Sequence, residues 1–265
     1  MYIKDSESTI KAGVEMSSTN IKTDERVIKY LRQKISEANK IVAIIGTEML
    51  VEGGGVDLDS NEHTYRVEEE YGYSPEDMLS CGFFNAKTEK FFKFYKNEIL
   101  SINVNFTPAY AALQKLQKAG KLSHVICTTL HGLPVDTNFK KVIYLNGNIN
   151  YNICPRCNKN FDLKYIIKSP GIPQCDKCKT AIRPDVRLIG ERVDTKLLTE
   201  ATNVSSEADV LLIMGIDIYD DHLEFSVTPE KKQTKILFTQ KESIKDRLVD
   251  FIIMDEIQII LPMLV

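Results

Sequence analysis

Residues 41–55 read IVAIIGTEMLVEGGG, and this stretch decides the expected fold. Its first five residues are apolar without alternation, which is typical of a parallel strand buried on both faces. The strand ends at Gly46 and a glycine-rich stretch follows, as in doubly wound α/β folds whose first turn brings backbone close to a pyrophosphate. The stretch does not fit the dinucleotide-binding pattern GxGxxG. The prediction of a doubly wound fold therefore depends also on the helices and strands around it.

Helices and strands alternate on either side of this strand. Val27, Leu31 and Ile35 recur at helical spacing before it, and Pro108 and Gly120 stand where the start and the end of a later helix belong. This alternation predicts an α/β chain with a doubly wound, Rossmann-like parallel sheet. The expected later elements are helices at 88–100, 108–120 and 195–208, and strands at 124–129, 140–153, 209–215, 235–239 and within 250–265.

The chain divides into a leader, a large domain with a cover, and a small inserted module. Between 47 and 86 neither period is sustained, so we expect a long loop with short helical pieces. The expected bounds are 1–22 for the leader, 23–150 and 183–265 for the Rossmann-like domain with its helical and loop cover at 47–106, and 151–182 for the module.

Four of the six cysteines form two pairs, Cys154-Pro-Arg-Cys157 and Cys175-Asp-Lys-Cys178, which are seventeen residues apart. This spacing predicts two knuckles that share one tetrahedral zinc ion. With four protein ligands the ion has no open position, so the site would be structural. The alternative is free thiols or a redox CxxC, but a redox motif needs only one pair. Cys127 stands apart and is expected to be a buried, inert thiol.

Composition excludes several classes of function. The formal net charge is −3 and no dense Lys/Arg block occurs, so we expect no nucleic-acid partner. No apolar run approaches the roughly 18 residues of a membrane span, and the N-terminus lacks a secretory apolar region. We therefore expect a cytoplasmic protein without a membrane partner.

The order of these motifs resembles the sirtuin family from about Glu25 to the closing ILPMLV. Its most specific parts are TPAYAAL at 107–113, the cysteine pairs, and IRPDVRLIGE at 182–191. The resemblance implies a Rossmann-like domain with an inserted zinc module. It also implies NAD-dependent transfer of an acyl group from lysine to ADP-ribose, with release of nicotinamide.

Two loops that hold phosphate in the family are altered here. Gly46-Thr47-Glu48 stands for Gly-Ala-Gly, and the loop that keeps Asp57 has Asp59 where the family has Arg. A carboxylate about 4 Å from a phosphate costs roughly 4 kcal/mol at an effective dielectric near 20, or about a thousandfold in affinity. We therefore expect NAD binding to be weakened or lost.

The remaining motifs depart as well. Thr128, Thr129 and His131 replace the Gln, Asn and Asp that contact cofactor in the family, and Gly215-Ile216-Asp217 replaces Gly-Thr-Ser. The catalytic histidine, a general base, falls at Asn146. An amide has no useful proton affinity at neutral pH, and loss of a positioned base typically costs two to four powers of ten in rate.

Our main hypothesis is a degenerate sirtuin, a zinc-binding pseudoenzyme without deacylase activity that acts as a binding or regulatory protein. Its peptide partner would pair with the strand Ile189-Gly190-Glu191. Two explanations of the altered pocket have equal weight: random loss of residues in a pocket that is no longer used, or a pocket that now binds another ligand. The second is favoured by acids and a histidine around one crevice, which would suit a cationic or metal-bearing ligand: Glu48, Asp59, Asp217 and His131. Taken alone, His131 is more often a hydrogen-bonded polar residue than a ligand-binding one. The alternatives are a divergent NAD-dependent deacylase or ADP-ribosyltransferase, and hydrolysis or transfer on another small molecule in the acidic crevice.

Overall fold

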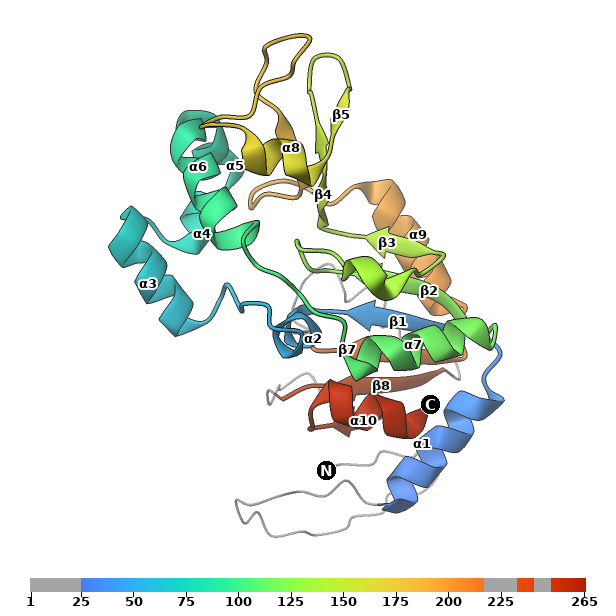
Figure 1. Cartoon of the computed structure of the whole chain (residues 1–265). Helices are drawn as coiled ribbons and strands as arrows, with labels where there is room; N and C mark the ends of the chain where they lie inside the picture. The colour runs from blue at the N-terminus through green and yellow to red at the C-terminus, as the bar shows by residue number, and fades with distance from the viewer. Residues whose placement is uncertain (1–24, 217–232, 241–248) are drawn as a thin grey trace.

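The computed structural model describes residues 25–216, 233–240 and 249–265. Its main sheet has six strands, all paired in parallel, in the order β3-β2-β1-β7-β8-β9 (Figure 1). This order runs outward in both directions from the first strand, as in doubly wound folds. The predicted fold class is confirmed. The strands are β1 Ile41–Ile45, β2 Leu122–Cys127, β3 Val142–Tyr144, β7 Val210–Met214, β8 Thr234–Phe238 and β9 Phe251–Ile253.

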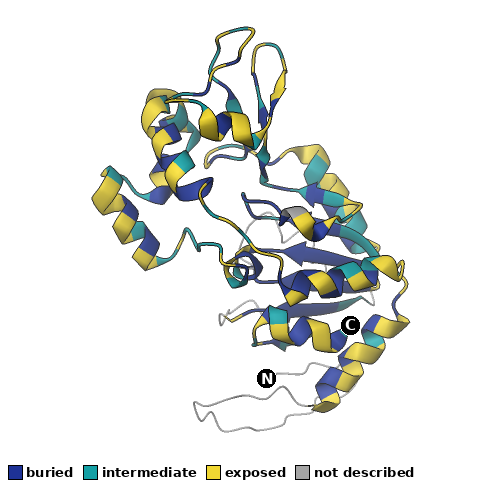
Figure 2. Ribbon diagram, in the orientation of Figure 1, coloured by how far each residue is buried: buried dark blue, intermediate teal, exposed yellow. Residues whose placement is uncertain are grey.

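Helices cover both faces of the sheet, and β1 shows how. Ile41, Ala43 and Ile45 pack with α1 (Glu25–Glu37), α7 (Pro108–Lys118) and α10 (Ile257–Leu264). Val42 and Ile44 point to the other face, where α9 (Thr195–Ser206) packs. All five residues of β1 are buried (Figure 2). A strand covered on both sides has no polar face, which explains its unbroken apolar sequence.

Residues 47–106 contain more helix than their sequence indicates. The helices are α2 Thr47–Glu52, α3 Asn61–Tyr71, α4 Pro75–Met78, α5 Cys81–Ala86, α6 Thr88–Phe94 and the π-helical turn η1 Tyr95–Ile99. The short helical pieces expected within 47–86 are present as α2, α4 and α5, but the eleven-residue helix α3 was not predicted and less of the segment is loop than expected. Local capping explains much of the difference, because the hydroxyls of Ser60, Ser74 and Ser80 each accept a backbone N–H in the first turn of the helix that follows.

A second sheet carries the cysteine pairs. It is antiparallel, with β4 (Gly147–Ile153) between β5 (Asn160–Phe161) and β6 (Arg183–Val186), and α8 (Leu163–Lys168) follows β5. Its buried side chains share one core with α6 and η1, and Lys96 of η1 donates to the carbonyl of Ser169 at 2.5 Å. The small sheet and the helical cover thus pack together beside the main sheet (Figure 1).

Across the ranges that the structure describes, no helix is both long and apolar enough to cross a bilayer. The leader proposed for 1–22 and the site residue Asp217 lie outside the described residues.

Candidate functional site

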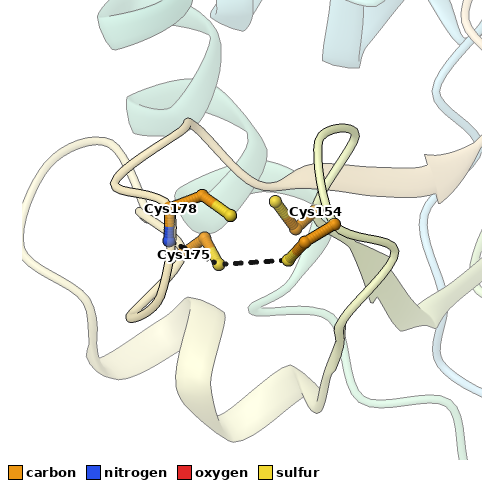
Figure 3. A group of neighbouring side chains, drawn as sticks. Cys154, Cys175 and Cys178 are labelled. Atoms are coloured by element: carbon orange, nitrogen blue, oxygen red, sulfur yellow. Dashed lines mark hydrogen bonds between the residues drawn. The ribbon is translucent and has the colours of Figure 1, made fainter.

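The four paired cysteines converge at one point. Their sulfurs all lie within 4.8 Å of one another, and the Sγ atoms of Cys157 and Cys175 are 3.8 Å apart. Four sulfurs at about 2.3 Å around a tetrahedral zinc ion are separated by about 3.8 Å, so the arrangement fits zinc. Cys154, Cys175 and Cys178 point toward a common centre in Figure 3.

The two halves of this cluster repeat the same backbone turn. Asn158 follows the first pair and Lys179 the second, both with positive φ (56° and 59°). The N–H of Asn158 donates to the Cys154 carbonyl at 2.9 Å, and the N–H of Lys179 donates to the Cys175 carbonyl at the same distance. Each CxxC is thereby closed into a tight turn that aims two sulfurs inward, as zinc knuckles require.

Four thiols this close cannot all ionise without a cation. Among the four thiols themselves, a side-chain hydrogen bond with Cys157 raises the pKa of Cys178 to about 12. Zinc binds thiolate, and its charge is what makes simultaneous deprotonation of four neighbouring sulfurs favourable. The donor set therefore suits a structural zinc ion held by Cys154, Cys157, Cys175 and Cys178.

A separate crevice of about 470 Å³ opens beside the carboxyl ends of β1, β2 and β7. This is the edge at which doubly wound sheets bind ligands. Eight residues singled out from sequence line it: Gly46, Thr47, Asp57, Asp59, Thr128, Thr129, His131 and Asn146. Sequence reasoning missed two charged residues of the lining, Glu76 and Arg187. Glu76 lies in the first turn of α4, which the Ser74-Pro75 helix-start signal could have located.

Glu48 does not line the crevice. Its carboxylate accepts from the hydroxyl of Thr239 at 2.7 Å and from the backbone N–H of Gln240 at 2.8 Å, both after β8. Its own N–H donates to the Gly215 carbonyl at 3.1 Å. These hydrogen bonds hold the start of α2 against the residues that follow β7 and β8. The Thr239 hydroxyl and the Gln240 N–H therefore already donate to a carboxylate of the same chain.

Gly215 makes this contact possible. Its φ is +61°, and a Cβ at this position would overlap the Cβ of Glu48. Glycine adopts this conformation without steric cost and also lets the two backbones approach. Gly215, which sequence analysis assigned to cofactor contact, thus allows close packing of α2 against the end of β7.

Asn146 follows β3 and is held on both sides of its amide. Its Nδ2 donates to the Thr128 carbonyl at 2.6 Å, and its Oδ1 accepts from Nε of Arg187 at 2.7 Å. The backbone N–H of Arg187 also donates to the Asn146 carbonyl at 2.9 Å. Both ends of the side chain are engaged, and neither can take a proton from a substrate.

His131 is 6% exposed, and its ring contacts a backbone carbonyl. Nε2 lies 3.1 Å from the carbonyl oxygen of Ile99. Because a carbonyl only accepts, Nε2 carries the proton and Nδ1 is left as an acceptor. Burial lowers the pKa of His131, so the ring is neutral at pH 7.

Cys127 ends β2 and is fully buried. Burial raises the pKa of its thiol, and its Sγ lies 3.4 Å from the Thr129 hydroxyl. A protonated, enclosed thiol is a poor nucleophile, in agreement with the inert role expected from sequence.

The segment Ile189-Gly190-Glu191 leaves β6 and runs beside the cover. The N–H of Ile189 donates to the Leu79 carbonyl, and its carbonyl accepts from the N–H of Cys81, both at 2.9 Å. The Glu191 carboxylate accepts from Arg183 at 2.6 Å and from the N–H of Leu188 at 2.8 Å. The backbone of Ile189 is thus already paired. The N–H of Glu191 donates to the Leu188 carbonyl at 3.0 Å and its carbonyl accepts from Arg187 at 3.4 Å, so Gly190 is the residue of this segment whose backbone pairs with no described residue.

Comparison with known proteins gives a consistent assignment. The Sir2 family model matches residues 46–219. A protein of Clostridium acetobutylicum named NAD-dependent protein deacetylase is 33% identical, over 86% of this chain and 96% of its own length. One of Clostridium tetani with the same name is 33% identical over 88% and 95%.

Solved structures share the fold. A Sir2 protein bound to a propionylated peptide superposes with a TM-score of 0.74 at 23% identity, covering 87% of this chain and 94% of the other. A Sir2 complex with a p53 peptide and NAD+ gives 0.74 at 23% identity, covering 90% and 95%.

Proposed function

This chain belongs to the Sir2 family, and we propose that it is a zinc-containing member that lacks NAD-dependent deacylase activity and acts as a binding or regulatory protein. The zinc ion would be structural, held by four thiolates with no open position for a substrate. What separates this chain from an active deacylase lies in its crevice.

The observation that carries the proposal is the state of Asn146. The residue stands where the resemblance places the general base, and both ends of its amide are engaged, one by the Thr128 carbonyl and the other by Arg187. An amide cannot accept a proton at neutral pH, so the ribose hydroxyl of a bound NAD would meet no base there. The expected loss is two to four powers of ten in rate.

The crevice and the start of α2 beside it also fit NAD poorly. The carboxylate of Glu48 already occupies the Thr239 hydroxyl and the Gln240 N–H, and Asp59 lines the wall where the resemblance places an arginine. A pyrophosphate entering here would meet negative charge in place of free donors. We therefore propose weakened NAD binding and derive no reaction step through the cofactor.

Peptide binding without catalysis remains open to this chain. Related folds have been solved with peptides bound, and Gly190 makes no backbone hydrogen bond to any described residue. An extended peptide could pair there by strand addition, since such binding needs only backbone donors and acceptors. The proposed partner surface is the segment Ile189-Gly190-Glu191, in which Gly190 would offer its backbone groups to the peptide.

The second candidate is a divergent NAD-dependent deacylase or ADP-ribosyltransferase. It is favoured by the relatives, which are named NAD-dependent protein deacetylases and align over most of this chain. Under this alternative NAD would still enter, and another group would replace the missing base.

An NAD-dependent deacylation assay separates the two. Wild-type protein should release no nicotinamide above background from NAD and an acetyl-lysine peptide. Asn146→His restores a base and should raise turnover if binding of NAD is the lesser defect. Asn150→His, the same change at a position on β4, is the matched control. Turnover by the wild-type protein at a rate typical of enzymes, about 1 s⁻¹ or more, would establish the divergent deacylase in place of the proposed function.

A further inference from the structure

Helix α3 of the cover is anchored by few buried side chains. Of its eleven residues only His63 and Val67 are buried. At its end the ring of Tyr71 packs edge-on against Phe94 of α6, with the ring centroids 5.6 Å apart. An element with so little buried surface opens at a low free energy, so a single polar contact can decide whether it stays in place.

The polar contact that joins α3 to η1 is an ion pair. Arg66 of α3 donates to both carboxylate oxygens of Glu98, with Nη1 and Oε1 3.3 Å apart. The Tyr71 hydroxyl donates to the same Oε1 at 3.1 Å. Because Glu98 is only 8% exposed, its charge depends on these donors. The position of the Arg66 guanidinium therefore controls how firmly α3 is held.

His63 binds the same guanidinium. Nη2 of Arg66 lies 3.2 Å from Nδ1 of His63. A guanidinium only donates, so Nδ1 is the acceptor and Nε2 carries the proton of a neutral ring. The residue is 5% exposed, and its Nε2 is buried without a hydrogen-bond partner among the described residues. The closed position of α3 thus requires a neutral imidazole and leaves one of its donors unsatisfied, which water would correct if the ring were released.

Protonation of the ring would reverse this contact. An imidazolium has N–H groups at both nitrogens, so Nδ1–H would point at a donor of Arg66 and two positive charges would face each other in a buried place. We infer that His63 is a pH-sensitive switch that holds α3 against η1 when it is neutral and releases α3 when it is protonated. The loop that leads into α3 carries Asp57 and Asp59 of the crevice wall, so release would free that wall as well. The inference goes beyond the proposed function, since it concerns the opening of the cover.

The charged groups that face His63 set the pH range of the switch. Burial, and then Arg66, lower the pKa of His63, against the opposing effect of three carboxylates: Glu98, Asp57 and Asp59. A released ring titrates near the ordinary value of about 6.5, so the released state takes up the proton first. The contact is therefore fully stabilising above about pH 6.5 and weakens as the pH falls below it, by up to about tenfold in the released population per pH unit. Arg66 lowers the pKa of Glu98, so that carboxylate stays charged over this range.

Hydrogen exchange of the α3 backbone amides in the zinc-loaded protein tests the switch. After correction for the intrinsic pH dependence of exchange, opening of α3 should increase roughly five- to tenfold from pH 7.5 to pH 5.5 in the wild type, while α7 stays protected. His63→Asn keeps an acceptor beside Arg66 that cannot be protonated, so its α3 should open equally at both pH values. His124→Asn is the matched control, because burial lowers the pKa of His124 as well and that residue lies on β2. It should keep the wild-type response.

A titration of the His63 ring by NMR checks the same switch without a variant. Its midpoint should lie below about pH 6.5. A midpoint at or above 6.5, an α3 whose opening does not change with pH in the wild type, or a pH response that His63→Asn retains would each overturn the inference. All three results would leave the proposed function standing, because nicotinamide release tests that function separately.

Discussion

At the scale of single residues, Glu48 and Gly215 act together. Glu48 joins α2 to the turn after β8 through its hydrogen bonds to Thr239 and Gln240. Gly215 has a positive φ and no Cβ, so α2 can pack closely against the end of β7. Sequence alone places an acid in a phosphate loop and predicts repulsion of a ligand. The structure adds that this acid is already satisfied within the chain, which sequence could not predict because its partners lie 191 and 192 residues away.

Gly215→Ala should destabilise the protein by about 2 to 4 kcal/mol. A left-handed conformation costs a non-glycine residue about 1 kcal/mol or more, and the new methyl group would also overlap Glu48. Gly120→Ala is the matched control, since its φ is +74° and nothing lies within 4 Å of an added Cβ. Urea unfolding should show a loss near 1 kcal/mol for the control. Equal losses in the two variants would mean that the contact with Glu48 contributes nothing.

At the scale of elements, the buried strands were the most predictable parts. β1 and β7 have five residues each, all buried, and their apolar runs end at glycines. The cysteine knuckles were equally clear, because metal ligands at fixed spacing need no tertiary information. The cover was predicted only in part. The helix expected at 88–100 is present as α6 and η1, but α3 buries only His63 and Val67 of its eleven residues, so its apolar face is too narrow to give a helical period.

Removal of zinc should unfold the small sheet and loosen the cover. Chelation or Cys175→Ser should lower the melting temperature by roughly 10 °C, because the metal supplies folding free energy and the module shares its core with α6 and η1. Cys81→Ser is the control, since Cys81 lies outside the cluster. Absence of metal in the purified protein, together with unchanged melting after chelation, would disprove a structural zinc site.

At the scale of the whole molecule, a doubly wound sheet brings distant loops to one edge. Three residues that line the crevice come just after β1, β2 and β3: Gly46, Thr128 and Asn146. The resemblance to the sirtuin family predicted that they would lie around one crevice. The chain then closes part of that edge with its own groups: Glu48 binds the turn after β8, and Glu52 accepts the N–H groups of Ile257 and Gln258 at the start of α10. Those contacts join segments that are far apart in the sequence. No local sequence pattern indicates them, so they could not be predicted.

The most direct test of this account is calorimetric titration of the zinc-loaded protein with NAD, with Glu48→Gly as the comparison. Removing the carboxylate frees the Thr239 and Gln240 donors and restores the glycine of the family loop. We predict no measurable heat for the wild-type protein and a measurable heat of binding for the variant. Binding of NAD to the wild-type protein with a dissociation constant of about 1 to 100 μM would contradict the account and identify the chain as an NAD-using sirtuin.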